Sequence, residues 1–253
     1  MTIGTIVRRF ESLASTNDTA RDLIRGGAAH GTVVVADEQT HGRGTRGRIW
    51  HSPRGLGLYA SFILSWEEPH GRDAPFPLLP LAAGLAAAEA VLESSGAAVR
   101  LKWPNDLVHD RKKLGGILTE TVFRAGSPGH AVIGIGINVN HRKPDFPAEL
   151  RKTAISIRLV TGREADREAL LDCLCRALDS WYNLLIRGGR ERIIRDYEER
   201  MAFPPGTNVR AATARGETAG VFRGLARDGR LRLAVAGVTE SLSFAEVQGL
   251  DWD

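Results

Sequence analysis

The feature that most restricts how this chain can fold is a glycine- and arginine-rich segment at residues 41–55, which directly follows a run of β-branched residues. Its centre, GRGTRG at residues 42–47, matches the G-x-G-x-x-G pattern of dinucleotide-binding turns, in which the third glycine must open a helix. Here Pro53, Gly55 and Gly57 follow too closely for a regular helix to form. No G-x-x-x-x-G-K-S/T phosphate loop occurs in the sequence either. The segment is therefore predicted to be a loop between two strands.

That loop is suited to binding an anion. Glycine lets a ligand approach the backbone N–H groups closely, and the guanidinium groups of Arg43, Arg46 and Arg48 match carboxylate or phosphate. A net charge of +4 also favours anionic partners, but it is too small to demonstrate nucleic-acid binding. A solvated basic loop that binds nothing stays open as an alternative when the loop is taken alone.

Strand and helix patterns alternate around the loop. Ser15 stands three residues before Asp18 and resembles a capping box for one short helix, which Gly26 and Gly27 would end. Residues 78–95 are rich in alanine and leucine and predict a buried helix that ends at Gly96. Further helices are expected after residue 164 and at residues 190–201. The β-like runs occupy residues 5–10, 32–40, 56–66, 98–103, 114–123 and 131–140, with a short hairpin at residues 104–113.

The composition changes at Pro204, Pro205 and Gly206, which predict a domain boundary. Beyond them, Asp228-Gly229 predicts a two-residue hairpin turn, and the remaining C-terminal residues are typical of a small all-β unit. We therefore expect one domain at residues 1–203 and a second at residues 204–253.

Cysteine use and hydropathy indicate a cytoplasmic protein. Cys173 and Cys175 stand two apart in a predicted helix, where their side chains point in different directions, so no disulfide and a reducing compartment are expected. The N-terminal residues lack the apolar core of a signal peptide, and no run approaches the roughly 18 apolar residues of a membrane span. No membrane partner is expected.

Lysine and glycine residues in the strand-like runs indicate a ligand. Lys102 ends one run and precedes Trp103 and Pro104, whose ring constrains the backbone around it. Most lysines are solvated surface groups, so Lys102 alone carries little weight. Glycines nevertheless interrupt the strand-like runs at residues 112–120 and 132–140, and glycine weakens a strand unless something must lie close to its backbone.

Five segments stand in a fixed order along the chain: STND at 15–18, EQTHGRGTRGRIWHSP at 38–53, LKWPNDL at 101–107, KKLGGILTE at 112–120 and GIGINVN at 134–140. In this order and spacing they resemble the catalytic domain of biotin protein ligases, and the unit after Pro205 resembles the SH3-like domain of the same enzymes. The resemblance implies an α+β fold, with a mixed β-sheet flanked by helices plus a small C-terminal SH3-like β-barrel. Only fourteen residues precede Ser15, so it also implies the ligase-only form without an N-terminal helix-turn-helix domain.

The resemblance implies a two-step reaction. Enzymes of this family make biotinyl-5′-adenylate from biotin and ATP with release of pyrophosphate, and then pass biotin to one lysine of a carrier protein. The expected partner is a biotin carboxyl carrier protein, an acetyl-CoA carboxylase subunit or a similar biotin domain, and no DNA partner is expected. Mg²⁺ would be held largely by the phosphates, so no metal-ligand cluster is expected. A homodimer formed through edge strands stays open.

The same resemblance assigns roles to residues that match the family motifs. Arg43 and Lys102 would be catalytic, because they would neutralise charge between the biotin carboxylate and the α-phosphate. The biotin-binding residues would be Ser15, Thr16, Asn17, Gln39, Gly42, Arg43, Gly44, Thr45, Lys102, Gly115, Gly116, Ile117 and Gly136. The ATP-binding residues would be Arg46, Gly47, Arg48, Trp50, Asn105, Lys113 and Asn138. The polar side chains would match the ureido ring, the glycines of the strands would leave room for the bicyclic ring and the ribose, and Trp103 would be structural.

One position departs from the family pattern. The family motif reads G-R-G-R or G-K-G-R, whereas Thr45 stands at the last position here and the next arginine is Arg46. Thr45 cannot supply the positive charge, so weaker retention of the adenylate is expected unless Arg46 replaces it. His41, where a small residue is usual, is a second departure without a clear consequence.

Two other functions compete with biotin ligation. A lipoate or octanoate transferase shares the catalytic fold, but an octanoyltransferase needs a cysteine nucleophile, and Cys173 and Cys175 lie far along the chain from the loop motifs. The polar residues at 15–17 and 39 also suit a ureido ring better than an aliphatic chain. A basic nucleic-acid-binding module is the alternative from another class, although the sequence has neither a helix-turn-helix nor a series of stacking aromatics.

Overall fold

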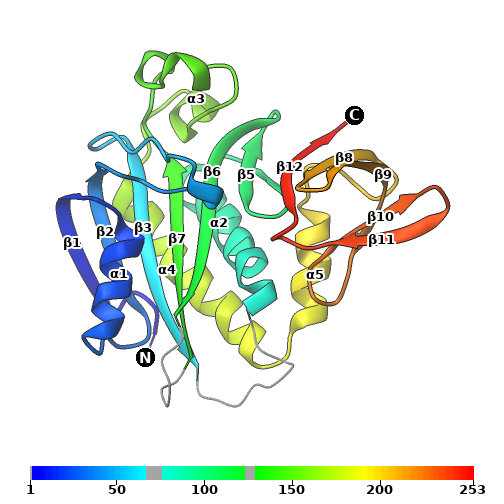
Figure 1. Cartoon of the computed structure of the whole chain (residues 1–253). Coiled ribbons are helices and arrows are strands. Elements are labelled where there is room, and N and C mark those ends of the chain that lie inside the picture. Colours follow the sequence, from blue (N-terminus) through cyan, green and yellow to red (C-terminus); the bar gives the residue numbers. More distant parts are fainter. Residues whose placement is uncertain (1, 67–75, 123–128) are drawn as a thin grey trace.

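The computed structural model describes residues 2–66, 76–122 and 129–253 (Figure 1). Within these ranges the larger of two β-sheets has seven strands in the order β1-β2-β3-β7-β6-β5-β4. β1 and β2 pair in parallel and the other neighbours pair antiparallel, so the predicted mixed sheet is confirmed. The strands are β1 (Ile6–Leu13), β2 (Thr32–Gln39), β3 (Gly57–Trp66), β4 (Arg100–Lys102), β5 (Asp106–His109), β6 (Lys112–Val122) and β7 (Gly129–Asn138).

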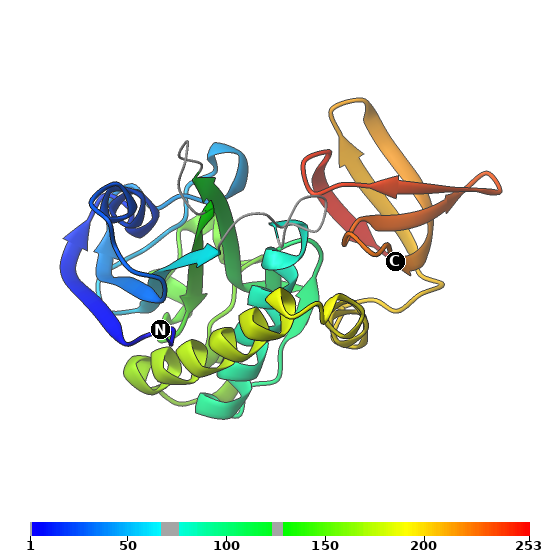
Figure 2. The same ribbon diagram turned by 90° about the horizontal axis from the view of Figure 1, so that it is seen from below.

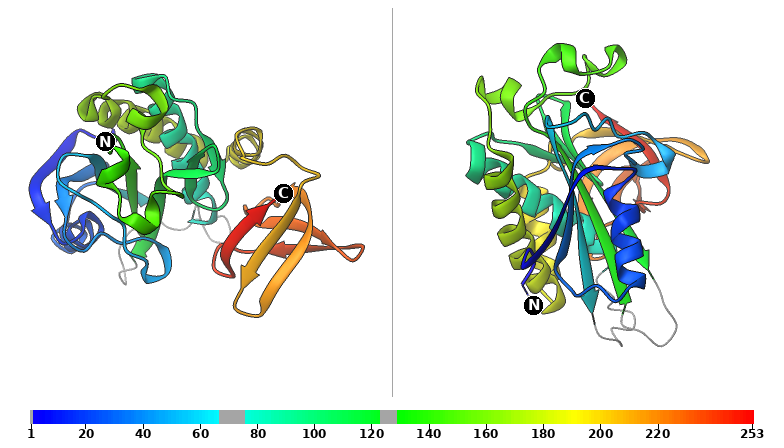
Figure 3. Two further views of the ribbon diagram at one scale, coloured as in Figure 1. Left: turned by 90° about the horizontal axis from the view of Figure 1, so that it is seen from above. Right: turned by 90° about the vertical axis from the view of Figure 1, so that its left-hand side faces the viewer.

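Helices cover both faces of this sheet (Figure 3). α1 (Thr16–Arg25) lies on one face, and α2 (Leu79–Ser95) packs against α4 (Arg167–Ile186) on the other. β3 is buried on both faces, because Phe62 joins the main core with α2 and α4 while Ile63 joins a smaller cluster with α1. Two further α-helices of the described chain are α3 (Ile157–Thr161) and α5 (Arg190–Glu199).

α2 agrees with the predicted buried helix. Its alanines and all its leucines except Leu92 are buried, because the sheet and α4 enclose most of the helix. Gly96 ends it in the left-handed region, at φ 76°, and its N–H donates to the carbonyl of Leu92 at 2.8 Å.

A second sheet forms the C-terminal unit, which stands beside the larger one (Figure 2). Its five described strands pair antiparallel in the order β11-β10-β9-β8-β12, in agreement with the all-β prediction. The strands are β8 (Asn208–Thr213), β9 (Gly216–Leu225), β10 (Leu231–Val235), β11 (Val238–Leu242) and β12 (Val247–Trp252). The predicted boundary at residues 203 and 204 falls in the connection between α5 and β8, and it stays a prediction.

The β9–β10 hairpin is longer than the predicted two-residue turn at Asp228-Gly229. The strands part after Leu225, and the N–H of Ala226 donates to the carbonyl of Arg230 at 2.8 Å. The longer loop lets Gly229 reach the larger unit, where a Cβ on it would lie 2.9 Å from Leu78.

Trp103 joins the two units. Its indole nitrogen donates to the carbonyl of Gly229 at 3.0 Å, and its ring stacks on Phe244 with 5.1 Å between the ring centroids. The side chain is fully buried. This placement supports the predicted structural role of Trp103.

α1 begins after Ser15, but the predicted capping bond is wrong. Ser15 has the extended backbone of an N-cap residue, yet its hydroxyl accepts no hydrogen bond from the first turn. Asp18 pairs instead with Arg21 and Arg43. The Ser15 hydroxyl is thus left free to line a cavity.

Cys173 and Cys175 lie on α4 as free, buried thiols, as the sequence predicts. Burial raises the pKa of Cys175 to about 11, so this thiol is protonated at neutral pH. Among the described helices, none has the length and apolar character needed to cross a membrane.

Candidate active site

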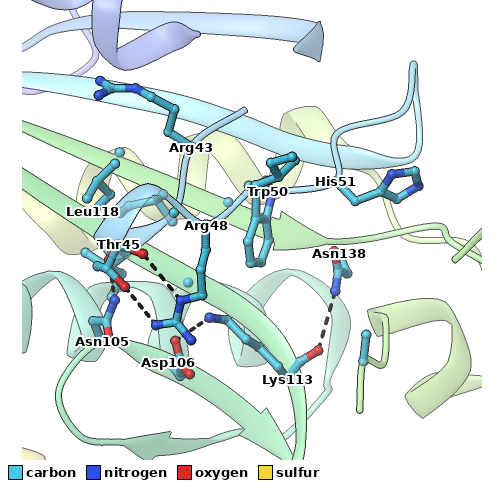
Figure 4. Close-up of a pocket in the computed structure, with 18 of the residues that line it drawn as sticks. Arg43, Thr45, Arg48, Trp50, His51, Asn105, Asp106, Lys113, Leu118 and Asn138 are labelled. Carbon is cyan, nitrogen blue, oxygen red and sulfur yellow. Dashed lines mark hydrogen bonds and ion pairs between the residues drawn. The ribbon is translucent and has the colours of Figure 1, made fainter. Parts of the chain in front are cut away.

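A cavity of about 400 Å³ lies between the glycine-arginine loop and the strands β6 and β7 (Figure 4). Its walls come from the start of α1, the end of β2, the loop, the strands β4 to β7 and residues 146–154. Segments far apart in the sequence therefore meet at one place.

The loop over this cavity is itself a small hairpin. The N–H of Trp50 donates to the carbonyl of Gly42 at 2.9 Å, and the N–H of Gly44 donates to the carbonyl of Arg48 at 2.7 Å. Arg46 and Gly47 form its turn, with φ of 61° and 71°, as the primed turns of β-hairpins require. The prediction of a strand-to-strand loop in place of a dinucleotide-binding turn is confirmed.

Arg46 does not replace the charge missing at Thr45. Its guanidinium donates to the carbonyls of Phe244 and Ala245 in the C-terminal unit, at 3.2 and 3.0 Å. The guanidinium that lies beside Thr45 is that of Arg48, whose Nη2 donates to Thr45 Oγ1 at 3.0 Å. Thr45 and Arg48 both line the cavity.

The polar end of the cavity contains the side chains of Ser15, Thr16, Asn17 and Gln39. Gln39 Oε1 accepts from the N–H of Thr16, and Gln39 Nε2 donates to Ser52 Oγ, each at 2.9 Å. Thr16 Oγ1 and Asn17 Oδ1 lie 2.7 and 2.6 Å from Ser61 Oγ. The structure therefore brings these four predicted residues together and fixes the Gln39 amide.

The Trp50 indole lies on the sheet within the cavity. A Cβ on Gly136 would lie 2.6 Å from Trp50 Nε1, and one on Gly116 would lie 3.3 Å from the same ring. In this structure the indole therefore fills the space that the sequence interpretation gave to the bicyclic ring and the ribose. Trp50 Nε1 is buried without a hydrogen-bond partner among the described residues.

The opposite end of the cavity is basic and is lined by Arg48, Lys102, Arg111 and Lys113. Asp106 is the one carboxylate among the described lining residues, and its Oδ1 lies 2.6 Å from Lys113 Nζ (Figure 4). Burial lowers the pKa of Lys102, and the carboxylates of Asp106 and Asp251 oppose that shift. A partly desolvated ammonium interacts more strongly with a bound anion than a solvated one does.

Arg43 differs from the basic residues at that end. Its side chain points away from Arg48 and Lys113 (Figure 4), and its Nη2 lies 2.8 Å from Asp18 Oδ1 and 3.0 Å from Glu120 Oε2. Its Nε is buried and has no partner within the described chain. The carboxylates of Asp18 and Glu120 thus neutralise the guanidinium.

The family follows from the sequence comparison. The chain matches the model of the biotin/lipoate A/B protein ligase family over residues 9–138. The chain belongs to this family. It is 35% identical over 236 residues to the bifunctional ligase/repressor BirA of Bacillus subtilis (strain 168), with 93% of this chain and 71% of that protein covered. It is 33% identical over 242 residues to the biotin–[acetyl-CoA-carboxylase] ligase of Paracoccus denitrificans, with 93% and 98% covered.

Solved structures of biotin protein ligases share the fold. The enzyme from Aquifex aeolicus in complex with biotin and ATP has a TM-score of 0.84 at 27% identity, over 98% of this chain and 100% of that chain. The enzyme from Leishmania major in complex with biotinyl-5-AMP has a TM-score of 0.64 at 26% identity, over 94% and 99%. The resemblance to biotin protein ligases, the fold class and the ligase class predicted from the sequence are confirmed.

Four residues that the family resemblance assigned to the site do not line the cavity in this structure: Gly42, Gly115, Arg46 and Gly47. A Cβ on Gly42 would lie 2.5 Å from the carbonyl of Trp50, so this glycine serves the packing of the loop. A Cβ on Gly115 would lie 3.0 Å from the carbonyl of Gly136 on the neighbouring strand. Arg46 and Gly47 form the turn, which Arg46 ties to the C-terminal unit. The other assigned residues line the cavity, including Gly44, Asn105, Ile117 and Asn138.

Sequence reasoning missed several lining residues, namely His51, Asp106, Gly134, Phe146 and Leu150. Asp106 and Gly134 belong to two of the family segments, so a signal for them was present. Phe146 and Leu150 lie in a connection after β7 that carries no motif. Only the folded chain places that connection beside the cavity.

The described residues contain no group of three or more His, Cys, Asp or Glu side chains arranged to hold a metal ion. Asp106 is the one carboxylate among the described residues that line the cavity. One carboxylate plus phosphate oxygens is a common way in which proteins of this kind bind Mg²⁺.

Proposed function

We propose that this ligase-family protein activates biotin with ATP to biotinyl-5′-adenylate and then transfers biotin to a lysine of a biotin carboxyl carrier protein. The observation that carries the proposal is a single cavity with neutral hydrogen-bonding groups at one end and basic side chains at the other. A ureido ring needs uncharged donors and acceptors, whereas phosphates need cations. The relatives solved with biotin and ATP and with biotinyl-5-AMP support the same pair of ligands.

At the polar end, Ser15, Thr16, Asn17 and Gln39 would hold the ureido ring. The side chains of Thr16, Asn17 and Gln39 are already fixed by hydrogen bonds to one another and to Ser61, so little ordering is needed when the ligand binds. Apolar lining residues, among them Tyr59, Ile117 and Ile135, would contact the rest of biotin.

In the first step, a carboxylate oxygen of biotin attacks the α-phosphorus of ATP. A new O–P bond forms, the bond between the α-phosphorus and the bridging oxygen breaks, and pyrophosphate leaves. Both reactants are negative, so Lys102 would neutralise the charge between them. Arg48, Arg111 and Lys113 would hold the leaving pyrophosphate, with Mg²⁺ supplying further charge neutralisation beside Asp106.

In the second step, the amine of the carrier lysine attacks the acyl carbon of the adenylate. A C–N bond forms, the bond from the acyl carbon to the phosphate oxygen breaks, and AMP leaves while the amine loses a proton. Lys102 beside the phosphate would stabilise AMP as a leaving group. No cysteine nucleophile is required, and neither Cys173 nor Cys175 lines the cavity.

ATP–pyrophosphate exchange with the purified protein tests this proposal, with biotin, lipoate or octanoate added separately. Exchange stimulated by biotin alone would support adenylation of biotin. Exchange stimulated by lipoate or octanoate would favour the alternative acid. No exchange with any acid, under conditions where a known biotin ligase is active, would refute the proposal.

A further inference from the structure

A cluster of four charged side chains lies directly behind the polar end of the cavity. Asp18 and Arg21 come from α1, Arg43 from the loop and Glu120 from β6. Arg43 bridges the two carboxylates, and Arg21 pairs with both of them as well. The two positive and two negative charges cancel, so the cluster adds no net charge next to a neutral part of the cavity.

Glu120 is the member of this cluster that accepts a hydrogen bond from Asn17. Its Oε2 accepts from Asn17 Nδ2 at 2.7 Å, and Arg43 Nη2 lies 3.0 Å from the same oxygen. Its Oε1 accepts from Arg21 Nη1 and Arg43 Nη2, each at 3.3 Å. Both oxygens therefore face N–H donors, and only a side chain with two hydrogen-bond acceptors can pair with all of these donors.

The carboxylate decides how the neighbouring protons are arranged. Because Asn17 turns its NH₂ group toward Glu120, Asn17 Oδ1 must accept, and the Ser61 hydroxyl 2.6 Å away is its donor. Ser61 has a single hydroxyl proton, so toward Thr16 Oγ1, 2.7 Å away, it can only accept. The Thr16 hydroxyl therefore donates to Ser61 Oγ, which is nearer to it than the other acceptor, Gln39 Oε1, at 3.0 Å. The hydrogen bonds thus run in one direction, from Thr16 through Ser61 and Asn17 to Glu120.

We propose that Glu120 is a positioning residue that fixes which groups at the polar end donate and which accept, and so sets the preference of the cavity for a ureido ring. The inference rests on the proposed function, because the ureido ring of biotin is the group concerned. In this arrangement Asn17 Oδ1 and Thr16 Oγ1 offer lone pairs, as the two N–H groups of a ureido ring require. Gly134 helps to keep Asn17 in place, since a Cβ there would collide with Asn17 Oδ1.

An exchange of functional groups tests this role. Glu120→Gln places an NH₂ group against Arg43 in either orientation, and also against Asn17 or Arg21, all of which donate. The volume of the side chain hardly changes. Asn17→Asp alone sets two carboxylates against each other. The double variant Asn17→Asp with Glu120→Gln restores a donor opposite an acceptor, and the carboxylate introduced at position 17 would still accept from Ser61. Glu93→Gln is the matched control, because Glu93 is an ion-paired glutamate on α2 outside the cavity.

The readout is the separate kinetic constants in biotin-dependent ATP–pyrophosphate exchange. Glu120→Gln is expected to raise the KM for biotin about tenfold, as the loss of a charge-assisted hydrogen bond does, with the KM for ATP and kcat within about twofold. The double variant is expected to recover the biotin KM to within about threefold of the wild-type value. A biotin KM unchanged by Glu120→Gln, or a double variant no better than the weaker single one, would overturn the role of Glu120. Wild-type protein without any biotin-dependent exchange would overturn the proposed function itself and this inference with it.

Discussion

The Lys102 ammonium lies 5.2 Å from the centroid of the Trp252 indole ring, so the last strand of the C-terminal unit reaches the basic end of the cavity. Arg111 Cζ lies 4.4 Å from the same ring, and Arg111 Nη2 donates to the carbonyl of Trp252 at 2.6 Å. An aromatic face stabilises a nearby cation. The C-terminal unit therefore stabilises the protonated form of Lys102, the lysine predicted to be catalytic.

Replacement of Trp252 is expected to change the pH dependence of the reaction. Trp252→Leu removes the ring that stabilises the ammonium, so the pKa of Lys102, already lowered by burial, falls further. Activity that needs the protonated lysine is lost as pH rises through this pKa, and the alkaline limb of kcat should move down by roughly half a pH unit. Trp252→Phe keeps an aromatic face and should leave the limb nearly in place. An alkaline limb at the same pH in both variants and in the wild type would show that the Trp252 ring does not affect the pKa of Lys102.

Lys102→Ala is expected to reduce kcat far more than it weakens biotin binding. The interactions of Lys102 should strengthen as charge develops at the α-phosphate, so kcat should fall about 10²- to 10³-fold, with the dissociation constant for biotin within about threefold. Steady-state kinetics and calorimetric titration with biotin measure the two effects. Lys112→Ala is the control, because Lys112 lies on β6 but does not line the cavity. Unaltered turnover in Lys102→Ala would end the catalytic assignment.

The sequence predicts much of the fold because local chemistry decides it. Gly96 ends α2 as expected, and the residues after Gly47 prevent a dinucleotide-binding helix. Arg43 shows where such reasoning stops, since a basic residue in an anion-binding loop is naturally assigned to the ligand. Its guanidinium instead meets Asp18 and Glu120, which are 25 and 77 residues away in the sequence. Only the packing of α1 on the sheet creates that pairing, and no local pattern reports it.

Trp252 shows a second limit of the sequence. It lies in a small β unit whose residues show no motif for chemistry, so nothing in the pattern links it to Lys102. The contact depends on how the two units pack through Trp103, Gly229 and Phe244. Residue types predict the strand, whereas the packing of the two units decides that it touches the active site.

Thr45→Arg is expected to lengthen the lifetime of bound biotinyl-adenylate. Thr45 lines the cavity, so a guanidinium there would meet the phosphate with charge-assisted hydrogen bonds that a hydroxyl cannot provide. The dissociation rate, followed by chase with unlabelled adenylate, should fall about tenfold. Thr40→Arg adds the same charge at an exposed threonine outside the cavity and serves as the control. An equal rate in wild type and Thr45→Arg would contradict the argument.

Arg46→Ala is expected to loosen the turn of the loop. The variant removes the two hydrogen bonds to the carbonyls of Phe244 and Ala245, while a non-glycine residue stays in the left-handed region. Amide hydrogen exchange at residues 43–49 should accelerate about tenfold, because each lost bond lowers the local opening free energy. Arg54→Ala, which removes a surface ion pair of the same chain segment, should leave those amides nearly unchanged. Equal protection in Arg46→Ala would show that the contact with the C-terminal unit does not hold the loop.

His141→Phe is expected to make the protein more stable in acid. Burial, with a smaller contribution from the nearby charge of His51, lowers the pKa of His141 to about 4. Between that value and an ordinary histidine pKa of about 6.5, the unfolded chain binds the proton more strongly than the folded one, so wild-type stability falls as pH falls through this window. Phenylalanine cannot take up the proton and can keep the stacking on Phe146, whose ring centroid lies 4.8 Å away.

Urea unfolding at pH 7 and pH 5 should therefore give a smaller loss of unfolding free energy for His141→Phe than for the wild type, by about 1 to 2 kcal/mol. His41→Phe, at an exposed histidine, should leave the loss unchanged, and an equal loss in His141→Phe would mean that His141 does not resist protonation in the folded state.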